Sequence, residues 1–371
     1  MFWLKMGEIA SKCEHLAGVP LRPDIASRLH TVFLAKGVLA TTAIEGNTLN
    51  EEQVIQQIDG TLDLPPSQRY LQQEIQNILD ACNAEVRGQI NDPNWAKHIC
   101  SSKIKEYNSQ VLKGLDVEND VVPGEFRSHS VVVGNVYRGA PAEDCEYLVD
   151  RLCEWLNGSD FECQDNDLTI PTALIRAIVA HVYLAWIHPF GDGNGRTARL
   201  VELQVLFSCG IPLPAAHLLS DHYNKTRTQY YRELNHASKS GGDVIPFITY
   251  ALQGFLDGLR EQLSLIRTQQ QNVAWENYVH DKFRQYKPSP TQKRRRDLVL
   301  ELTKHNWKQV SDIPDMSPTL AREYANAGER MLQRDLNAIN KMDLILRRHG
   351  EVRARKELIS AFLPATTPTP I

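Results

Sequence analysis

The sequence predicts a mainly α-helical protein that carries one short β-hairpin and ends in a separate, basic module. Apolar residues recur at helical spacing as far as residue 260, whereas residues 130–138 have a β-rich pattern. The formal net charge of −4 is divided unevenly, because the positive charge gathers near the C-terminus. With 371 residues, of which 42% are hydrophobic and 23% charged, the chain has the composition of a soluble globular protein of two or three domains.

The cellular location of the protein is predicted from two sequence features that are not found: a long apolar run and a secretory signal. No run approaches the roughly 20 consecutive apolar residues of a membrane helix, and the opening MFWLKMGEIASKCEHL lacks the layout of a secretory signal. We therefore expect a cytoplasmic protein that does not contact a membrane. The seven cysteines are scattered and never spaced C-x-x-C, which disfavours both a zinc site and a disulfide framework.

Residues 1–115 are predicted to form an N-terminal helical region. A helix is expected over about 25–46, because apolar residues keep helical spacing as far as Ile44 and Gly46 suits a C-terminal cap. Two more amphipathic helices are expected in EEQVIQQIDGT and RYLQQEIQNILDACNAEV.

The β-rich segment is predicted to be a hairpin. Residues 130–133 and 136–138 are two short β-rich runs on either side of Gly134 and Asn135. A lone hairpin is marginally stable, so it must lean on another part of the protein. Its outer edge could pair with an extended peptide, and the alternative is a surface ornament.

The centre of the protein is predicted from two apolar helices, TALIRAIVAHVYLAWI and GRTARLVELQVLFSCG. The first is apolar on nearly all sides, which places it in the core. Two more helices are expected to complete the region 116–260. Residues 261–290 are expected to form a helical, polar linker.

The C-terminal module is predicted over residues 291–358, followed by a tail at 359–371. Residues 287–356 hold 16 Lys and Arg against nine Asp and Glu, a net +7, which leaves −11 on the remainder. Three helices and two strands around His349 and Gly350 resemble a winged helix-turn-helix, with RDLNAI typical of its recognition helix. Five basic side chains could contact DNA phosphates: Arg334, Arg347, Arg348, Arg353 and Arg355. The alternative is a module that docks proteins or dimerises.

The stretch IHPFGDGNGRTARL, residues 187–200, gathers residue types that act on phosphates. His188, beside Pro189, can accept a proton near neutral pH. Asp192 offers the hard oxygen ligand that suits Mg²⁺. Bare backbone at the start of the next helix favours an anion, and it is provided by Gly193, Asn194 and Gly195.

Arg196 and Arg199 complete this set. They lie three residues apart on one side of the helix, and each can fork onto phosphate oxygens. The stretch therefore predicts phosphoryl or nucleotidyl transfer, because it combines a base, a metal ligand, an anion cradle and two phosphate-binding arginines. The alternative is a plain glycine-rich turn between core helices, and the joint occurrence argues against it. Neither G-x-G-x-x-G nor G-x-x-x-x-G-K-[ST] is present, and the acidic positions of an EF-hand are missing.

HPFGDGNGRTAR matches every fixed position of HPFx[DE]GN[GK]RxxR, the signature of the Fic family, which the chain therefore resembles. The resemblance implies a Fic-type helical bundle whose catalytic core is residues 116–260. It implies transfer of AMP from ATP, with Mg²⁺, to a Ser, Thr or Tyr hydroxyl of a target protein or of the chain itself. The hairpin would be the flap that positions the target through Val131, Val132 and Val133.

Roles follow from the same resemblance. His188 would deprotonate the target hydroxyl, Asp192 would hold Mg²⁺ between the α- and β-phosphates, and Phe190 would anchor the loop in the core. The anion hole would be formed by Gly193, Asn194 and Gly195. The β- and γ-phosphates would be held by Arg196 and Arg199. The adenine pocket would be lined by Tyr230, Tyr231, Asn235 and Ser238.

TTAIEGN resembles the inhibitory motif [ST]xxxE[GN] of autoregulated Fic proteins, matched here by Thr41, Glu45 and Gly46. The helix over about 25–46 would then be inhibitory. A Glu45 carboxylate paired with Arg199 would occupy the γ-phosphate clamp and misalign ATP. In some relatives this glutamate also helps to remove AMP from the target.

Two other functions stay open at this stage. One is transfer of a different phosphate-containing group, and the other is a nucleotide-sensing, DNA-binding transcription regulator. Expected partners are ATP, a target protein, DNA or a protein at the C-terminal module, and a second copy of the chain.

Overall fold

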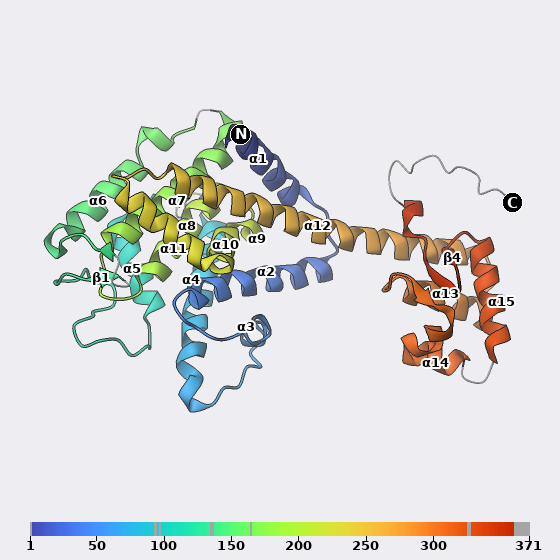
Figure 1. The fold of residues 1–371 in the computed structure, drawn as a ribbon. Coiled ribbons are helices and arrows are strands. Elements are labelled where there is room, and N and C mark those ends of the chain that lie inside the picture. Colours follow the sequence, from blue (N-terminus) through green and yellow to red (C-terminus); the bar gives the residue numbers. More distant parts are fainter. Residues whose placement is uncertain are drawn as a thin grey trace. The chain divides into compact units, whose positions relative to one another are not determined.

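The computed structural model describes residues 2–92, 95, 98–133, 137–163, 165–324 and 328–359. The chain divides into two compact units, Met1–Leu263 and Ser264–Ile371 (Figure 1). Within the described residues the protein is mainly helical, which confirms the predicted fold class. The hairpin turn at 134–136 and the tail from residue 360 lie outside the described residues.

Five helices form the N-terminal part of the first unit: α1 (Phe2–Gly18), α2 (Pro23–Ala43), α3 (Glu51–Ile58), α4 (Arg69–Asn91) and α5 (Ser101–Val111). Helix α2 ends three residues before the predicted limit. The N–H groups of Glu45 and Gly46 donate to the carbonyls of Thr42 and Ala43, and Gly46 has a φ of +106°. Glu45 therefore lies on a tight turn just after the helix.

Strands β1 (Val132–Val133) and β2 (Tyr137–Arg138) form the predicted hairpin, although each strand is shorter than expected. They pair antiparallel, with Val132 opposite Arg138. The N–H of Gly139 also donates to the carbonyl of Val131 at 3.2 Å.

The core of the first unit is built on α6 (Cys145–Leu156), α7 (Thr169–Ile187) and α8 (Asn194–Ser208). By length and composition alone, the span from Asn166 to Ile187 is long and apolar enough to cross a membrane. This span was not predicted from the sequence, because it is not an uninterrupted run of apolar residues. Of its most apolar window, 67% is buried inside the protein, as in a core helix. Helix α7 packs on α8, and the loop between them carries the HPFGDG segment.

Four helices follow: α9 (Leu213–Ala216), α10 (Leu218–Lys225), α11 (Arg227–Lys239) and α12 (Ile245–Arg284). Helix α12 is 40 residues long and continues without a break past residue 261, where the linker is predicted to begin. No proline or glycine lies between Gly258 and Arg284 to end it. Short 3₁₀ turns lie at Pro66–Gln68, Ala142–Asp144, Ser159–Phe161, Asn166–Leu168, Val310–Met316 and Lys356–Ile359.

Within its described residues, the second unit contains the C-terminal part of α12, three further helices and a three-stranded antiparallel sheet. The helices are α13 (Pro290–Leu302), α14 (Pro318–Tyr324) and α15 (Gly328–Lys341). The strands, in sheet order, are β3 (Lys308–Gln309), β5 (Glu351–Ala354) and β4 (Ile345–Arg348). The predicted three helices and two strands are present. The sequence did not predict β3, because two polar residues carry no strand pattern.

A buried carboxylate joins the helices of the second unit. Asp335 on α15 accepts hydrogen bonds from the Nε atoms of Arg294 and Arg295 on α13, both at 2.7 Å. The hydroxyl of Tyr324 on α14 donates to the same carboxylate at 3.2 Å. The three helices therefore meet at one charged group.

We expect Asp335→Asn to lower the free energy of unfolding of the second unit by about 3–5 kcal/mol, because it leaves two arginines without a counter-charge. Hydrogen exchange of peptides from residues 264–359 in the full chain would measure this loss. Asp297, which pairs with Arg296 nearer the surface, is the matched control, and Asp297→Asn should cost less than about 1 kcal/mol. Equal losses in both variants would contradict this role of Asp335.

Candidate active site

The loop between α7 and α8 is held in a defined conformation by its own residues. His188 caps α7 in the left-handed region, with φ +50°, and its N–H donates to the carbonyl of Leu184 at 2.9 Å. Asn194 closes the loop, because its side chain accepts from the N–H of Phe190 at 2.9 Å and donates to the Phe190 carbonyl at 2.8 Å. The Phe190 ring is buried against Phe126. The side-chain amide of Asn194 is thus used within the loop, whereas its backbone N–H lies at the start of α8.

Arg127 fixes this loop to the hairpin, and no motif in the sequence pointed to it. The guanidinium donates to the carbonyl of His188 at 2.8 Å and to that of His129 at 2.6 Å. It also bonds to the carbonyl of Ala140, beyond the second strand. One buried side chain therefore sets the position of both His188 and the predicted flap.

His188 is suited to act as a base. Burial lowers the pKa of its imidazole, and the charge of Arg127 lowers it further, although the carboxylates of Glu45 and Asp192 raise it in part. The imidazole is therefore neutral at pH 7 and can take a proton.

The start of α8 has the backbone arrangement expected of the predicted anion cradle. Gly193 is the N-cap residue with φ +76°, and the first N–H groups of a helix have no partner within it. Gly195 lies in the first turn, where a Cβ atom would come within 2.1 Å of the Glu45 Oε1 atom. The Glu45 carboxylate thus lies against the helix start at a point that only a glycine leaves open.

Asp192 is the candidate metal ligand. Its side chain is half exposed, and its backbone is held by Asn108, whose amide donates to the Asp192 carbonyl at 2.8 Å. Within the described ranges, no group of three or more His, Cys, Asp or Glu side chains could hold a metal by itself. A single carboxylate fits Mg²⁺, which takes its other ligands from water and phosphate.

Arg199 is paired with Glu45. Its Nη2 atom lies 2.5 Å from Glu45 Oε1 and donates to the carbonyl of Thr41 at 2.9 Å. The Arg199 side chain is 1% exposed and that of Glu45 is 32% exposed. Burial would raise the pKa of the Glu45 carboxyl, but Arg199 outweighs burial and holds that pKa below its usual value. The two charges therefore form a largely desolvated ion pair.

Two donors of Arg199 are left over. Its Nε and Nη1 atoms are buried and have no hydrogen-bond partner among the described residues. Buried donors are seldom left unpaired, and each unpaired donor costs about 1–3 kcal/mol. An anion with several oxygens, such as a phosphate, would satisfy them.

The acidic side chain one turn further along α8 does not neutralise Arg199. Burial raises the pKa of Glu202 to about 8, and the Tyr223 hydroxyl donates to it at 3.0 Å. Burial lowers the pKa of the neighbouring His181 to about 3. Both groups are uncharged at pH 7, so the charge of Arg199 is left to Glu45 or to a ligand.

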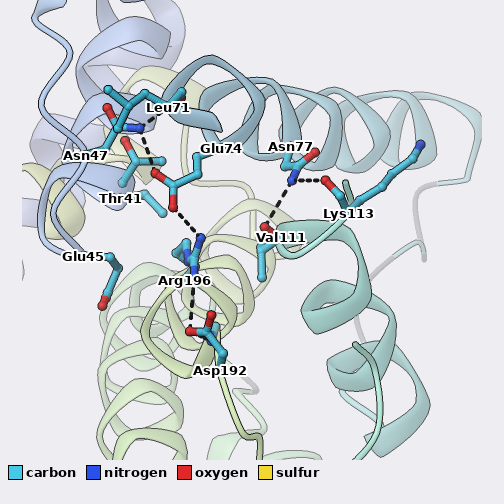
Figure 2. Close-up of polar contacts among 12 residues, drawn as sticks. Thr41, Glu45, Asn47, Leu71, Glu74, Asn77, Val111, Lys113, Asp192 and Arg196 are labelled. Atoms are coloured by element: carbon cyan, nitrogen blue, oxygen red, sulfur yellow. Dashed lines mark hydrogen bonds and ion pairs between the residues drawn. The ribbon is translucent and has the colours of Figure 1, made fainter. Parts of the chain in front are cut away.

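Arg196 contacts two carboxylates. Its Nη1 atom donates to Glu74 Oε1 at 2.9 Å, and its Nη2 atom lies 3.4 Å from Asp192 Oδ1 (Figure 2). The other oxygen of Glu74 accepts from the Asn47 amide at 2.8 Å. No motif or spacing in the sequence pointed to Glu74 or Asn47 at this site. Glu74 is one polar residue among many on α4, and only the chain path brings it to α8.

The four residues expected to line an adenine pocket all lie on α11 and differ in exposure. Tyr230 is 3% exposed, and its hydroxyl lies 2.9 Å from His181 Nε2, so it belongs to the core. Tyr231 is 45% exposed, and Asn235 and Ser238 are half-buried on the same helix, α11. The rings of Tyr230 and Tyr231 lie 5.1 Å apart, and both hydroxyl groups act electrostatically on Arg199, so the adenine pocket stays a prediction. The expected outer edge of the hairpin includes Val132, which is exposed, and Val131, which is half-buried; the side chain of Val133 lies outside the described residues.

Most of the basic residues expected to contact DNA are bonded within the second unit. The guanidinium groups of Arg348 and Arg353 lie 4.1 and 5.1 Å from the centre of the Trp307 ring. Hydrogen bonds or ion pairs within the unit also engage Arg347 and Arg355. Arg334 is exposed on α15. DNA binding therefore stays a prediction, and most of these arginines would have to exchange present partners for phosphates.

Comparison with known proteins gives the class of the first unit. Residues 98–206 match the Fic/DOC family. The chain therefore carries a Fic domain over residues 98–206, which contains α7, the loop after it and α8 as far as residue 206.

Relatives of known name match a longer part of the chain. "Protein adenylyltransferase fic-1" of Caenorhabditis elegans is 29% identical over 242 residues, which cover 64% of this chain and 42% of the relative. "Protein adenylyltransferase Fic" of Nematostella vectensis is 29% identical over 245 residues, covering 66% and 52%. The chain thus spans about half, or less, of the length of these curated relatives.

Solved structures share the fold. A Fic family protein from Desulfovibrio desulfuricans G20 has a TM-score of 0.57 and 23% identity, covering 95% of this chain and 94% of that one. Fic-1 (residues 134–508) from C. elegans has a TM-score of 0.56 and 25% identity, covering 71% and 72%.

Proposed function

We propose that this protein is an adenylyltransferase that restrains itself, moving AMP from ATP to a Ser, Thr or Tyr hydroxyl of a target protein or of itself. The observation that carries the proposal is the pairing of Glu45 with Arg199 beside unpaired guanidinium donors and an open helix start. Supporting it, relatives that match about two thirds of this chain are named protein adenylyltransferases.

In the proposed reaction the chain positions ATP and takes one proton. The start of α8 cradles the α-phosphate, and Arg196 and Arg199 hold the β- and γ-phosphates. His188 accepts the proton of the target hydroxyl as its oxygen forms a bond to the α-phosphorus. The bond from that phosphorus to the bridging oxygen breaks, and pyrophosphate leaves. Mg²⁺ held by Asp192 would supply positive charge to the phosphates.

Glu45 restrains the reaction by occupying Arg199. Its carboxylate and a γ-phosphate cannot share the same guanidinium face, so ATP would bind with its α-phosphate turned away from in-line attack. The turn that carries Glu45 lies in the same chain as the site, so no partner is required to impose the restraint.

Glu45 could also serve in removal of AMP, as the resemblance implies. Its carboxylate is ionised, and its charge acts on His188, the group that would return a proton to the leaving hydroxyl. Release of AMP from a modified target by wild-type protein, and its loss in Glu45→Gln, would support this second activity. Equal release by both proteins would overturn it.

Mass spectrometry of purified Glu45→Gly after incubation with ATP and Mg²⁺ tests the transferred group. We expect AMP adducts on hydroxyl side chains. An adduct of phosphate alone, or of another phosphate-containing group, would contradict the proposal.

The pH dependence of the rate reports on His188. A general base works only when deprotonated, and the pKa of this imidazole lies below its usual 6.5. The rate in Glu45→Gly should therefore be above half of its maximum at pH 6.5 and fall through its midpoint only at lower pH, since loss of the Glu45 charge lowers the pKa again. ATP affinity measured at each pH separates this titration from that of the phosphates. A rate already halved at or above pH 6.5 would argue against His188 as the base.

A further inference from the structure

Arg196 is held by a carboxylate that lies outside the Fic signature. Glu74 lies on α4, 122 residues earlier in the chain, and accepts from the guanidinium at 2.9 Å. The Arg196 side chain is buried and that of Glu74 is mostly buried. The same guanidinium is 3.4 Å from Asp192, the candidate metal ligand (Figure 2). Arg196 is thus shared between two carboxylates, and the shorter contact is to Glu74.

Glu74 is itself fixed from two sides. Its second oxygen accepts from the Asn47 amide, and Asn47 also donates to the carbonyl of Leu71, one turn earlier on α4. Asn77, three residues after Glu74, donates to the carbonyls of Val111 and Lys113 (Figure 2). Helix α4 is therefore tied both to the turn after Glu45 and to the end of α5.

The space around these groups is open to a ligand. A cavity of about 340 Å³ is lined by Tyr70, Glu74, Leu115, Asp116, Asp192 and Arg196. A buried guanidinium must keep a counter-charge, because an unpaired buried charge is costly. If Glu74 were neutral, Arg196 would turn to Asp192 and compete there with a cation.

We infer that Glu74 is a positioning residue of the site. It holds Arg196 in place for the phosphates and keeps it from closing onto Asp192. This inference rests on the proposed function for the identity of the ligands, Mg²⁺ and ATP. Groups that orient a metal site from outside its ligand set typically contribute 10–100-fold to metal affinity or activity.

The test measures ATP binding by titration calorimetry at rising Mg²⁺ concentrations, with every variant built on Glu45→Gly so that Arg199 is free. We expect Glu74→Gln to raise the Mg²⁺ concentration at half-maximal ATP affinity by about 10-fold or more. Glu74→Asp keeps the negative charge but places it one methylene further from Arg196. This variant should raise the Mg²⁺ midpoint by a smaller factor. In an Arg196→Gln background, Glu74→Gln should have no further effect on this midpoint.

The matched control is Glu52→Gln, which removes an exposed carboxylate on α3 and should leave the Mg²⁺ midpoint unchanged. A lower melting temperature with an unchanged midpoint in Glu74→Gln would overturn the inference. If that variant does not fold, an unchanged midpoint in Glu74→Asp would overturn it instead. Failure of Glu45→Gly to transfer AMP would contradict the proposed function and leave the binding measurement intact, so the two failures are distinguishable.

Discussion

Glu45→Gly is expected to raise the rate of AMP transfer by on the order of 100-fold or more, because misplacing a reacting group by about 1 Å can cost that factor. In the structure the Glu45 carboxylate lies 2.5 Å from Arg199 Nη2 and against the first turn of α8 at Gly195. Its removal frees the clamp and the cradle together. Pyrophosphate release at saturating ATP and Mg²⁺ measures the effect.

Two further variants make this result specific. Glu45→Gln keeps the shape of the side chain but loses the charge, so it should activate less than Glu45→Gly. Glu51→Gly changes a nearby carboxylate at the start of α3 and should leave the rate near that of the wild type. Activation by Glu51→Gly equal to that by Glu45→Gly would show that loosening this region, rather than freeing Arg199, is the cause.

His188→Ala, placed in the Glu45→Gly background, is expected to lower the rate of transfer by about 10²–10⁴-fold, the usual contribution of a general base. ATP affinity should change little, because the proposed phosphate contacts come from α8 and its arginines. Single-turnover rates together with ATP affinity separate the two effects.

The control for His188 is His15→Ala, which removes an exposed imidazole from α1. His15→Ala should leave the single-turnover rate and the ATP affinity unchanged. A His188→Ala variant that loses ATP binding in proportion to its rate would show that the imidazole supports the loop instead of taking the proton. A rate within about threefold of the Glu45→Gly parent would remove His188 from the chemistry altogether.

The helical fold could be predicted because it depends on apolar spacing along short segments. The ends of the elements could not, because they depend on individual hydrogen bonds that the apolar spacing does not reveal. Helix α2 stops at Ala43 since the next N–H groups turn back onto Thr42 and Ala43. Strand β3 exists only because β5, some 40 residues later, pairs with it.

Some residues of the candidate site could likewise be predicted from the sequence, and others could not. His188, Asp192 and Arg196 could be predicted as one site because they lie within nine residues, and the chain itself keeps them together. Arg127 and Glu74 could not, since each reaches the motif from another element, 61 and 122 residues from its partner. The burial of Tyr230 could not be predicted for a related reason, because neighbouring positions on a helix face different sides and only packing shows which side is buried.

We propose above that Glu45 and the nucleotide compete for Arg199 in an enzyme that transfers AMP. The most direct test is incubation of the wild type, Glu45→Gly and Glu45→Gly with His188→Ala with α-labelled ATP and Mg²⁺, followed by measurement of label bound to protein. We expect little label on the wild type, strong label on Glu45→Gly and none on the double variant. Equal labelling of all three would contradict it.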